Sequence, residues 1–310
     1  MRTLRAVVVG VGRMGRHHAR VYADMPDVDL VAIVDPDPVA CLEVAREYAC
    51  VDYDNPVDLC SETDFDLASI CTPTVHHHGA AITMILMGAH VLVEKPVAAT
   101  VPEARDLIAS AHQRGVVLAV GHIERCNPIV TEVKRRMDAG DLGDVYRVAT
   151  RRVGPSPRRI RDVGVAVDLA THDLDVMRYL LDCEPLDCHA MLQHRRHGWM
   201  EDGVDALLRF ESGAVGVLSC DWLSTAKQRT LAVTGAQGEI VADYIAQEAT
   251  VYTAPDSCES VTVPREEPLV VELRSFVAAC RGESRPAATG EDGLRALEMA
   301  IELGEEEGNG

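Results

Sequence analysis

The sequence predicts an α/β protein of two domains. The first is a doubly wound parallel sheet, and the second is an α+β domain with a mostly antiparallel open sheet. The chain has 310 residues, enough for about two domains. Apolar runs alternate with helical segments up to about residue 122, and closely spaced strand-like runs dominate after it. We therefore expect domains covering residues 1–122 and 123–310.

The first 122 residues contain short apolar runs separated by segments with helical spacing. The runs are Val7–Val9, Leu30–Val34, Leu67–Cys71, His90–Val93 and Val116–Val120. The helical segments cover residues 14–25, 37–49, 77–87 and 102–114. Continuous apolar runs are typical of parallel strands covered on both faces. Their alternation with helices predicts a doubly wound sheet.

After residue 123 the pattern becomes a series of strands framed by helices. Helices are expected at 128–139, 168–181, 268–281 and 291–303. Strands are expected at 145–153, 187–194, 204–210, 214–220, 229–234, 239–244 and 249–253. Turn signals such as Glu211-Ser212-Gly213 separate them. This order predicts a mostly antiparallel sheet with helices on one face.

The chain is strongly acidic. It carries 49 acidic and 30 basic residues, a net charge of −19, and its lysines are Lys95, Lys134 and Lys227. Such a surface repels nucleic acids and anionic membranes, so we expect neither as a partner. A composition rich in acids and poor in lysine resembles that of salt-adapted proteins, although a GC-biased genome also favours arginine.

Neither a membrane segment nor a metal site is expected. No apolar run approaches the roughly 18 residues of a membrane helix, and Leu4–Val9 leads directly into a predicted strand. We therefore expect a cytoplasmic protein, whose ten cysteines, none in a C-x-x-C pair, are reduced thiols. The run His76–His78 lacks a neighbouring acid cluster, so no metal is predicted.

A glycine-rich turn follows the first predicted strand. Three glycines in a G-x-G-x-x-G pattern permit a tight turn that brings backbone N–H groups to a pyrophosphate at a helix N-terminus. Asp35 ends the second strand, where a carboxylate binds the ribose hydroxyls of NAD and repels the extra phosphate of NADP. The pattern predicts a Rossmann domain that binds NAD in preference to NADP. The predicted contacts are Gly10, Val11, Gly12, Arg13, Met14, Gly15 and Asp35.

A second cluster of polar residues begins the predicted helix at 168–181. Asp168, His172 and Asp175 are spaced to share one helix face. A carboxylate beside a histidine can hold its tautomer and raise its basicity, which suits proton transfer. The alternative is a His–Asp pair that caps or solvates the helix start. Asp175 is expected on a solvated face.

Three further segments complete the pattern. They are Cys71–His77, the tripeptide Glu94-Lys95-Pro96, and Gly121–Pro128, each at the end of a predicted strand. With the glycine turn and the helix of Asp168 and His172, they resemble the glucose-fructose oxidoreductase, inositol dehydrogenase and MocA family (Gfo/Idh/MocA). The resemblance covers nearly the whole chain, with the segments in the family's order.

The resemblance implies NAD-dependent oxidation of a sugar hydroxyl to a ketone. His172 matches the family's general base, Asp168 the carboxylate four residues before it, and Lys95 the lysine beside the nicotinamide and the reacting hydroxyl. A cation there stabilises a developing alkoxide. For Glu94, a capping or pairing role with Lys95 is the alternative. The further cofactor contacts implied are Cys71, Thr72, Pro73, His77, Glu94, Lys95 and His122.

An arginine-rich segment precedes the helix of His172. Residues 151–165 carry five arginines in an acidic chain, and guanidinium groups bind phosphate with paired hydrogen bonds. This favours an anionic substrate; a solvated loop or a contact between subunits is the alternative. The segment and its surroundings resemble the UDP-N-acetylglucosamine 3-dehydrogenase branch, although Cys126 replaces its usual aromatic residue. The predicted substrate contacts are Lys95, Arg125, Asn127, Arg158, Arg159, Arg161, Asp168 and His172.

Other functions remain compatible with the family. One is an inositol or free-sugar dehydrogenase, against which the arginines argue. Another is an NAD-binding regulator without turnover, which would usually lack the lysine or the histidine, whereas this chain has both Lys95 and His172. The family commonly associates through the open face of its second sheet, so we expect a homo-oligomer, either a dimer or a tetramer.

Overall fold

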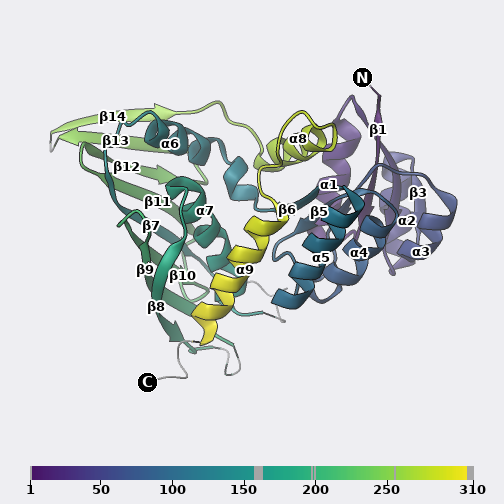
Figure 1. Cartoon of the computed structure of the whole chain (residues 1–310), viewed down its shortest axis with the longest axis horizontal. Helices are drawn as coiled ribbons and strands as arrows, with labels where there is room; N and C mark the ends of the chain where they lie inside the picture. The colour runs from purple at the N-terminus through teal and green to yellow at the C-terminus, as the bar shows by residue number, and fades with distance from the viewer. Residues whose placement is uncertain (1, 157–162, 197, 199, 255, 306–310) are drawn as a thin grey trace. The chain divides into compact units, whose positions relative to one another are not determined.

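The computed structural model describes residues 2–156, 163–196, 198, 200–254 and 256–305. It divides into two compact units of similar size (Figure 1). The first comprises Met1–Ile123 and Leu269–Arg295, and the second comprises Glu124–Pro268 and Ala296–Gly310. The predicted fold class is confirmed in both.

The first unit contains a parallel sheet with the strand order β3-β2-β1-β4-β5-β6. Its strands are β1 (Leu4–Val9), β2 (Val28–Val34), β3 (Val51–Tyr53), β4 (Leu67–Ile70), β5 (His90–Glu94) and β6 (Leu118–Gly121). Its helices are α1 (Arg13–Asp24), α2 (Pro38–Tyr48), α3 (Pro56–Glu62), η1 (Thr74–His76), α4 (His77–Leu86), α5 (Val101–Arg114) and α8 (Pro268–Cys280). All pairings between these six strands are parallel. The carboxyl ends of the strands therefore meet at one edge, where ligands bind in such sheets.

Helix α8 belongs to this first unit although it comes late in the chain. Leu273 and Phe276 are 0% and 1% exposed and pack in one core with Ile33 of β2 and Tyr22 of α1. The sequence predicted one contiguous second domain at 123–310, whereas the structure groups Leu269–Arg295 with the first unit. The physical reason is that α8 buries its apolar face against the parallel sheet, a contact that spacing along the chain cannot reveal.

The second unit contains a sheet with the strand order β14-β13-β12-β11-β7-β10-β9-β8. The strands are β7 (Val145–Val153), β8 (Pro185–Gln193), β9 (Gly203–Phe210), β10 (Val215–Asp221), β11 (Gln228–Gly235), β12 (Gly238–Asp243), β13 (Glu248–Ala254) and β14 (Ser257–Thr262). Only β7 and β10 pair in parallel among these strands.

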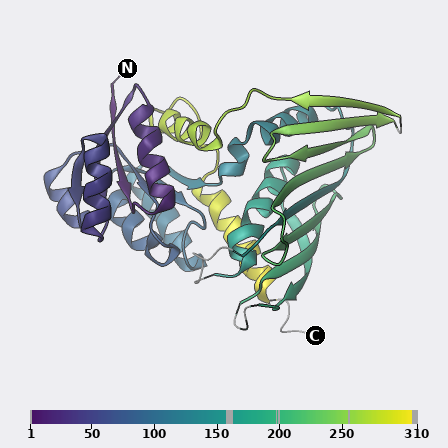
Figure 2. The ribbon, with the colours of Figure 1, turned by 180° about the vertical axis from the view of Figure 1, so that it is seen from behind.

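Helices α6 (Pro128–Asp138), α7 (Thr171–Leu181) and the later part of α9 (Gly290–Glu305) lie on one face of this sheet, as Figure 2 shows from behind. Their apolar side chains share a core with alternate residues of the strands. The other face carries exposed large side chains, among them Tyr146, Leu207 and Val241. It is therefore the open face that the sequence predicted.

Among the described residues, no helix combines the length and apolarity needed to span a bilayer.

Candidate active site

The glycine turn between β1 and α1 uses each glycine for a different reason. Gly10 has φ of +90°, and a Cβ there would lie 2.8 Å from the carbonyl of Cys71. A Cβ on Gly15 would lie 1.8 Å from the carbonyl oxygen of Gly10, so helix and turn pack too closely for any side chain. A Cβ on Gly12 would meet nothing within 4 Å. Two glycines thus shape the turn, and the third leaves its surface open.

The N-terminus of α1 begins at this open surface. Gly12 is the N-cap, no side chain caps the helix, and its first turn contains no acidic residue. The first N–H groups of a helix have no partner within it and attract anions. Arg16 N donates to Gly12 O at 3.1 Å, which begins the helical ladder. The turn therefore fits the pyrophosphate of a dinucleotide.

Asp35 lies one residue beyond β2, next to the same turn. Its Oδ2 accepts a hydrogen bond from Val11 N at 2.7 Å, and its Oδ1 accepts one from Asp37 N at 2.9 Å. Each carboxylate oxygen can accept a second hydrogen bond, so ribose hydroxyls can still bind. Asp37 itself caps α2 through Val39 N. Two carboxylates at this point oppose a further phosphate, which fits NAD.

His77 joins two of the loops that follow the strands. Its Nδ1 lies 2.7 Å from Pro96 O and its Nε2 lies 2.9 Å from Thr72 O. Burial lowers the pKa of this imidazole, and its two backbone carbonyls only partly oppose that. His77 therefore ties the segment Thr72-Pro73 to the turn at Lys95-Pro96, whose peptide bond is cis.

The side chain of Glu94, at the end of β5, is mostly buried rather than exposed to solvent. Its Oε1 lies 3.0 Å from Nε2 of His18, a fully buried residue of α1. A Cβ on Gly121 would lie 3.2 Å from the Glu94 carboxyl carbon, so the glycine makes room for it. Burial alone would raise the pKa of Glu94. The His18 hydrogen bond, with the charges of Lys95 and His77, outweighs burial, so the pKa is lowered.

Sequence reasoning missed His18. The signal was available, because Gly15, His18, Ala19 and Tyr22 form the buried face of α1, and a histidine there is polar among small and apolar residues. His122, also predicted as a cofactor contact, follows β6 and is 2% exposed. Lys95, by contrast, is partly exposed. Thus the predicted cofactor residues of the first unit gather around the glycine turn and the adjoining strand ends.

In the second unit, Asp168 lies in a π-helical turn, η3 (Ala166–Ala170), which runs into α7. Asp168 is 8% exposed and His172, in the first turn of α7, is partly exposed. The expectation that Asp175 lies on a solvated face is wrong, because Asp175 is 1% exposed and pairs with Arg125. Most sides of α7 are buried, and Arg125 rather than solvent satisfies the Asp175 carboxylate.

The predicted substrate residues divide into three groups. Arg125 pairs with Asp175, and Asn127 caps α6 through Ile129 N and also donates to Tyr244 O at 3.2 Å. Both contacts are structural, and substrate binding by these residues stays a prediction. Arg158, Arg159 and Arg161 lie outside the described residues. Lys95 belongs to the first unit and Asp168 and His172 to the second, each described within its own unit.

Two of the five arginines assigned to the approach loop belong to strand β7 instead. Arg151 donates to Gln228 at 3.0 Å across the sheet. Arg152 is 4% exposed and donates to Asp173 at 2.9 Å and Glu124 at 2.7 Å. The interpretation of five loop arginines is therefore wrong, because alternation along the strand turns Arg152 into the core.

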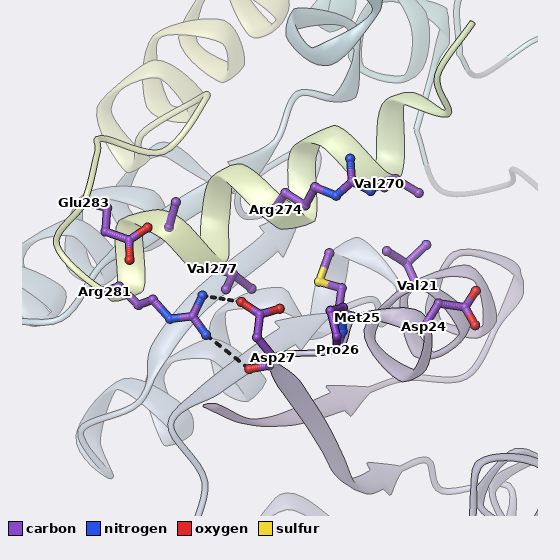
Figure 3. A pocket seen from close by; sticks show the side chains of 11 residues that line it. Val21, Asp24, Met25, Pro26, Asp27, Val270, Arg274, Val277, Arg281 and Glu283 are labelled. Atoms are coloured by element: carbon purple, nitrogen blue, oxygen red, sulfur yellow. Dashed lines mark hydrogen bonds and ion pairs between the residues drawn. The ribbon is translucent and has the colours of Figure 1, made fainter. Parts of the chain in front are cut away.

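The first unit contains a cavity of about 720 Å³ (Figure 3). It is formed by the C-terminal end of α1, the turn after it and helix α8, with Val21, Met25 and Val277 among its apolar lining. Arg281 spans its edge and donates to the carboxylate and the carbonyl of Asp27. Among the described residues, none of the predicted site residues lines it.

Comparison with known proteins extends over nearly the whole chain. A profile of an oxidoreductase family with an NAD-binding Rossmann fold matches residues 4–122, and one of the GFO/IDH/MocA C-terminal domain matches residues 130–241. The chain is 28% identical to a scyllo-inositol 2-dehydrogenase (NAD(+)) of Bacillus subtilis, over 96% of this chain and 92% of the relative. It is also 28% identical to a UDP-N-acetylglucosamine 3-dehydrogenase of Acidithiobacillus ferrooxidans, over 97% and 96%.

A solved structure of the Acidithiobacillus ferrooxidans enzyme superposes with a TM-score of 0.90, covering 98% of this chain and 97% of that one. The likeness therefore spans both units, and the glycine turn, Asp35 and Lys95 lie within the matched Rossmann region. The chain belongs to the Gfo/Idh/MocA family of oxidoreductases, whose first domain binds NAD.

Proposed function

We propose that the protein is an NAD-dependent dehydrogenase that oxidises a secondary hydroxyl of a sugar to a ketone. The observation that carries the proposal is the glycine turn, where Gly12 leaves open space before an uncapped helix and Asp35 stands beside it. Family membership supports the reaction class, since two relatives of equal identity are named as a scyllo-inositol 2-dehydrogenase and a UDP-N-acetylglucosamine 3-dehydrogenase.

His172, Lys95 and Asp168 are the residues that we assign to the chemistry. NAD, when bound by the turn and Asp35, supplies the hydride acceptor. His172 removes the hydroxyl proton, because a neutral imidazole is a competent base near neutral pH. Lys95 donates a hydrogen bond to the same oxygen as negative charge develops on it. Asp168 orients the imidazole and balances the charge it gains.

The proposed substrate is a nucleotide sugar, and the 3-hydroxyl of UDP-N-acetylglucosamine is the specific candidate. The full-length likeness to the Acidithiobacillus ferrooxidans enzyme supports it. Arg158, Arg159 and Arg161 remain as cations for a diphosphate after Arg151 and Arg152 are assigned to β7. An inositol is the second candidate, favoured by equal identity to the Bacillus subtilis enzyme.

The test is NAD reduction by the purified protein, followed by absorbance in low and high salt. The panel contains UDP-N-acetylglucosamine, N-acetylglucosamine, UDP-glucose, myo-inositol and scyllo-inositol. Turnover of the UDP-sugar, with competitive inhibition by UDP, supports the nucleotide-sugar proposal. Turnover of an inositol alone refutes it. NAD binding without any turnover would instead indicate a regulator.

We also propose a homo-oligomer, a dimer or a tetramer, located in the cytoplasm. Exposed apolar side chains on the open sheet face support association there, among them Tyr146, Leu207, Val215, Val241 and Tyr252. Light scattering after size-exclusion chromatography measures the mass directly. A monomer at micromolar concentration would contradict this part of the proposal.

A further inference from the structure

Two buried carboxylates follow His172 on α7, and the mechanism above uses neither. Asp173 and Asp175 are each 1% exposed. A carboxylate in such surroundings is costly unless a cation and further hydrogen bonds satisfy it. In both cases the cation is an arginine from a different element of the second unit.

Asp175 is held by Arg125, which comes from the short helix η2 (Ile123–Cys126). The Nε of Arg125 lies 2.7 Å from Oδ2 and a terminal nitrogen lies 2.6 Å from Oδ1, so the guanidinium and the carboxylate form a two-pronged fork. The two side chains are 8% and 1% exposed. The ring of Tyr179, one turn further along α7, packs on the guanidinium at 5.3 Å.

Asp173 is held in the same way by Arg152 of β7. The Nε of Arg152 lies 3.0 Å from Oδ2 and a terminal nitrogen lies 2.9 Å from Oδ1. Its other terminal nitrogen donates to Glu124 at 2.7 Å, and the ring of Tyr244 lies 5.3 Å from the guanidinium. Burial opposes the charge of Arg152, but the charges of Asp173 and Glu124 outweigh it and raise the pKa of Arg152. The arginine is therefore a permanent cation. Burial also raises the pKa of Asp173, and Arg152 opposes that only in part.

The ion pairs Arg125–Asp175 and Arg152–Asp173 hold α7 on nearly opposite sides of the helix. Successive residues of an α-helix are about 100° apart around its axis, which separates Asp173 from Asp175 by about 200° and places His172 between them. A helix held at two such points cannot roll about its axis. At a radius of about 6 Å, a roll of about 10° moves a side chain by about 1 Å, and a misplacement of that size can cost about 100-fold in rate.

We propose that Arg125 and Arg152 are positioning residues, which fix the rotation of α7 and thereby the place of the His172 imidazole. Arg125 in this role contacts Asp175 rather than the substrate. The inference rests on the proposed function of His172. Buried ion pairs contribute little net stability. The role that we assign to these two pairs is therefore to fix the orientation of α7.

The test removes one fork without leaving an unpaired buried charge. In the double variant Arg125→Met/Asp175→Leu, both partners become apolar, a change that is often neutral for stability. We expect the melting temperature to stay close to that of the parent. We expect kcat to fall by about 10- to 100-fold with KM for NAD and for the sugar unchanged.

A matched control lies on the same helix. Arg178 and Glu184 form a fork at the C-terminal end of α7, with nitrogen–oxygen distances of 2.9 and 2.5 Å. The variant Arg178→Met/Glu184→Gln should leave kcat unchanged, because this pair lies more than a turn from His172. If both double variants lose kcat equally, general helix stability explains the loss and the inference is wrong.

A second readout does not need turnover. Diethyl pyrocarbonate modifies accessible imidazoles, and peptide mass spectrometry reports the rate at His172. We expect this rate to change several-fold in Arg125→Met/Asp175→Leu and to stay constant in the control. A parent protein without turnover would therefore refute the proposed function, while the modification rates would still decide the positioning role.

The remaining outcomes are also decisive. A rise in KM for the sugar with unchanged kcat would show that Arg125 binds substrate and would overturn the inference. An unchanged kcat and modification rate would overturn it as well. If the double variant does not fold, Arg125→Lys keeps the charge but loses the fork. It should then show the same fall in kcat at unchanged KM, and an unchanged kcat would overturn the inference.

Discussion

The glycine turn offers a sharp comparison, because Gly12 and Gly15 belong to one motif but face different surroundings. Alanine at Gly12 adds a Cβ that meets nothing within 4 Å, and its φ of −61° suits any residue. The substitution should leave the fold intact or stabilise it by about 0.4–1 kcal/mol, since alanine restricts the unfolded chain. The new methyl group projects over the surface where a pyrophosphate must approach the backbone.

The expected loss is therefore one of binding rather than of stability. Displacing the pyrophosphate from a single N–H removes a hydrogen bond to a charged group, which is worth about 1.5–3 kcal/mol. That energy corresponds to about 10- to 100-fold weaker NAD binding. Titration calorimetry with NAD measures the dissociation constant, and thermal unfolding without NAD measures stability.

Alanine at Gly15 provides the contrasting control. Its Cβ would lie 1.8 Å from the carbonyl oxygen of Gly10, so the turn and the helix must separate. Overpacking of this kind costs about 1–3 kcal/mol or more, and Gly15→Ala should lower the melting temperature even without NAD. If Gly12→Ala binds NAD as tightly as the parent, the turn does not hold the pyrophosphate and the reasoning is refuted.

Four further results are expected. Asp35→Ser should raise the ratio of kcat/KM for NADP over NAD, because the carboxylate that repels the extra phosphate is gone; an unchanged ratio would contradict the role of Asp35. Arg152→Met leaves Asp173 buried without its cation and should destabilise by about 3–5 kcal/mol in urea titrations, whereas Arg209→Met, at an exposed pair, should change little. The hydrogen bond from Arg135 lowers the pKa of Glu132 from 4.5 to about 2. Glu132 therefore stabilises the fold above pH 4.5, and that stability is lost as the pH falls towards 2. In Glu132→Gln the melting temperature should depend less on pH between pH 4.5 and 2, and an unaltered pH dependence would disprove the assignment. The net charge of −19 makes the folded chain repel itself. Salt screens this repulsion, so the melting temperature should rise with potassium chloride, and a melting temperature independent of salt would contradict this expectation.

The strands and helices that the sequence predicted are those with buried apolar residues. The strands it missed are β3 and β14, whose residues are mostly exposed or intermediate. A strand without a run of buried apolar residues leaves no hydrophobic pattern in the sequence. Both strands form at a sheet edge, where a neighbouring strand pairs with them through backbone hydrogen bonds. The short helix α3, with Leu59 as its buried residue, was missed for the same reason.

The site was predictable where a known sequence pattern defines it. The glycines and Asp35 form such a pattern, although Val11 and Asp35 are 24 residues apart. The partners of Asp173 and Asp175 follow no such pattern; Arg152 and Arg125 lie 21 and 50 residues away along the chain. Helical periodicity assigns polar residues to solvent and cannot anticipate a buried arginine from another element.

The return of the chain to its first unit has a consequence for synthesis. The Rossmann core is completed by Leu269, Leu273, Phe276 and Val277 of α8. Domains of a growing chain often fold in the order in which they leave the ribosome. Here the nascent cofactor-binding unit cannot complete its core until α8 is synthesised, which happens only after the whole second sheet has been translated. Part of its apolar surface stays uncovered until then. A fragment ending at residue 122 would keep that surface exposed and should aggregate.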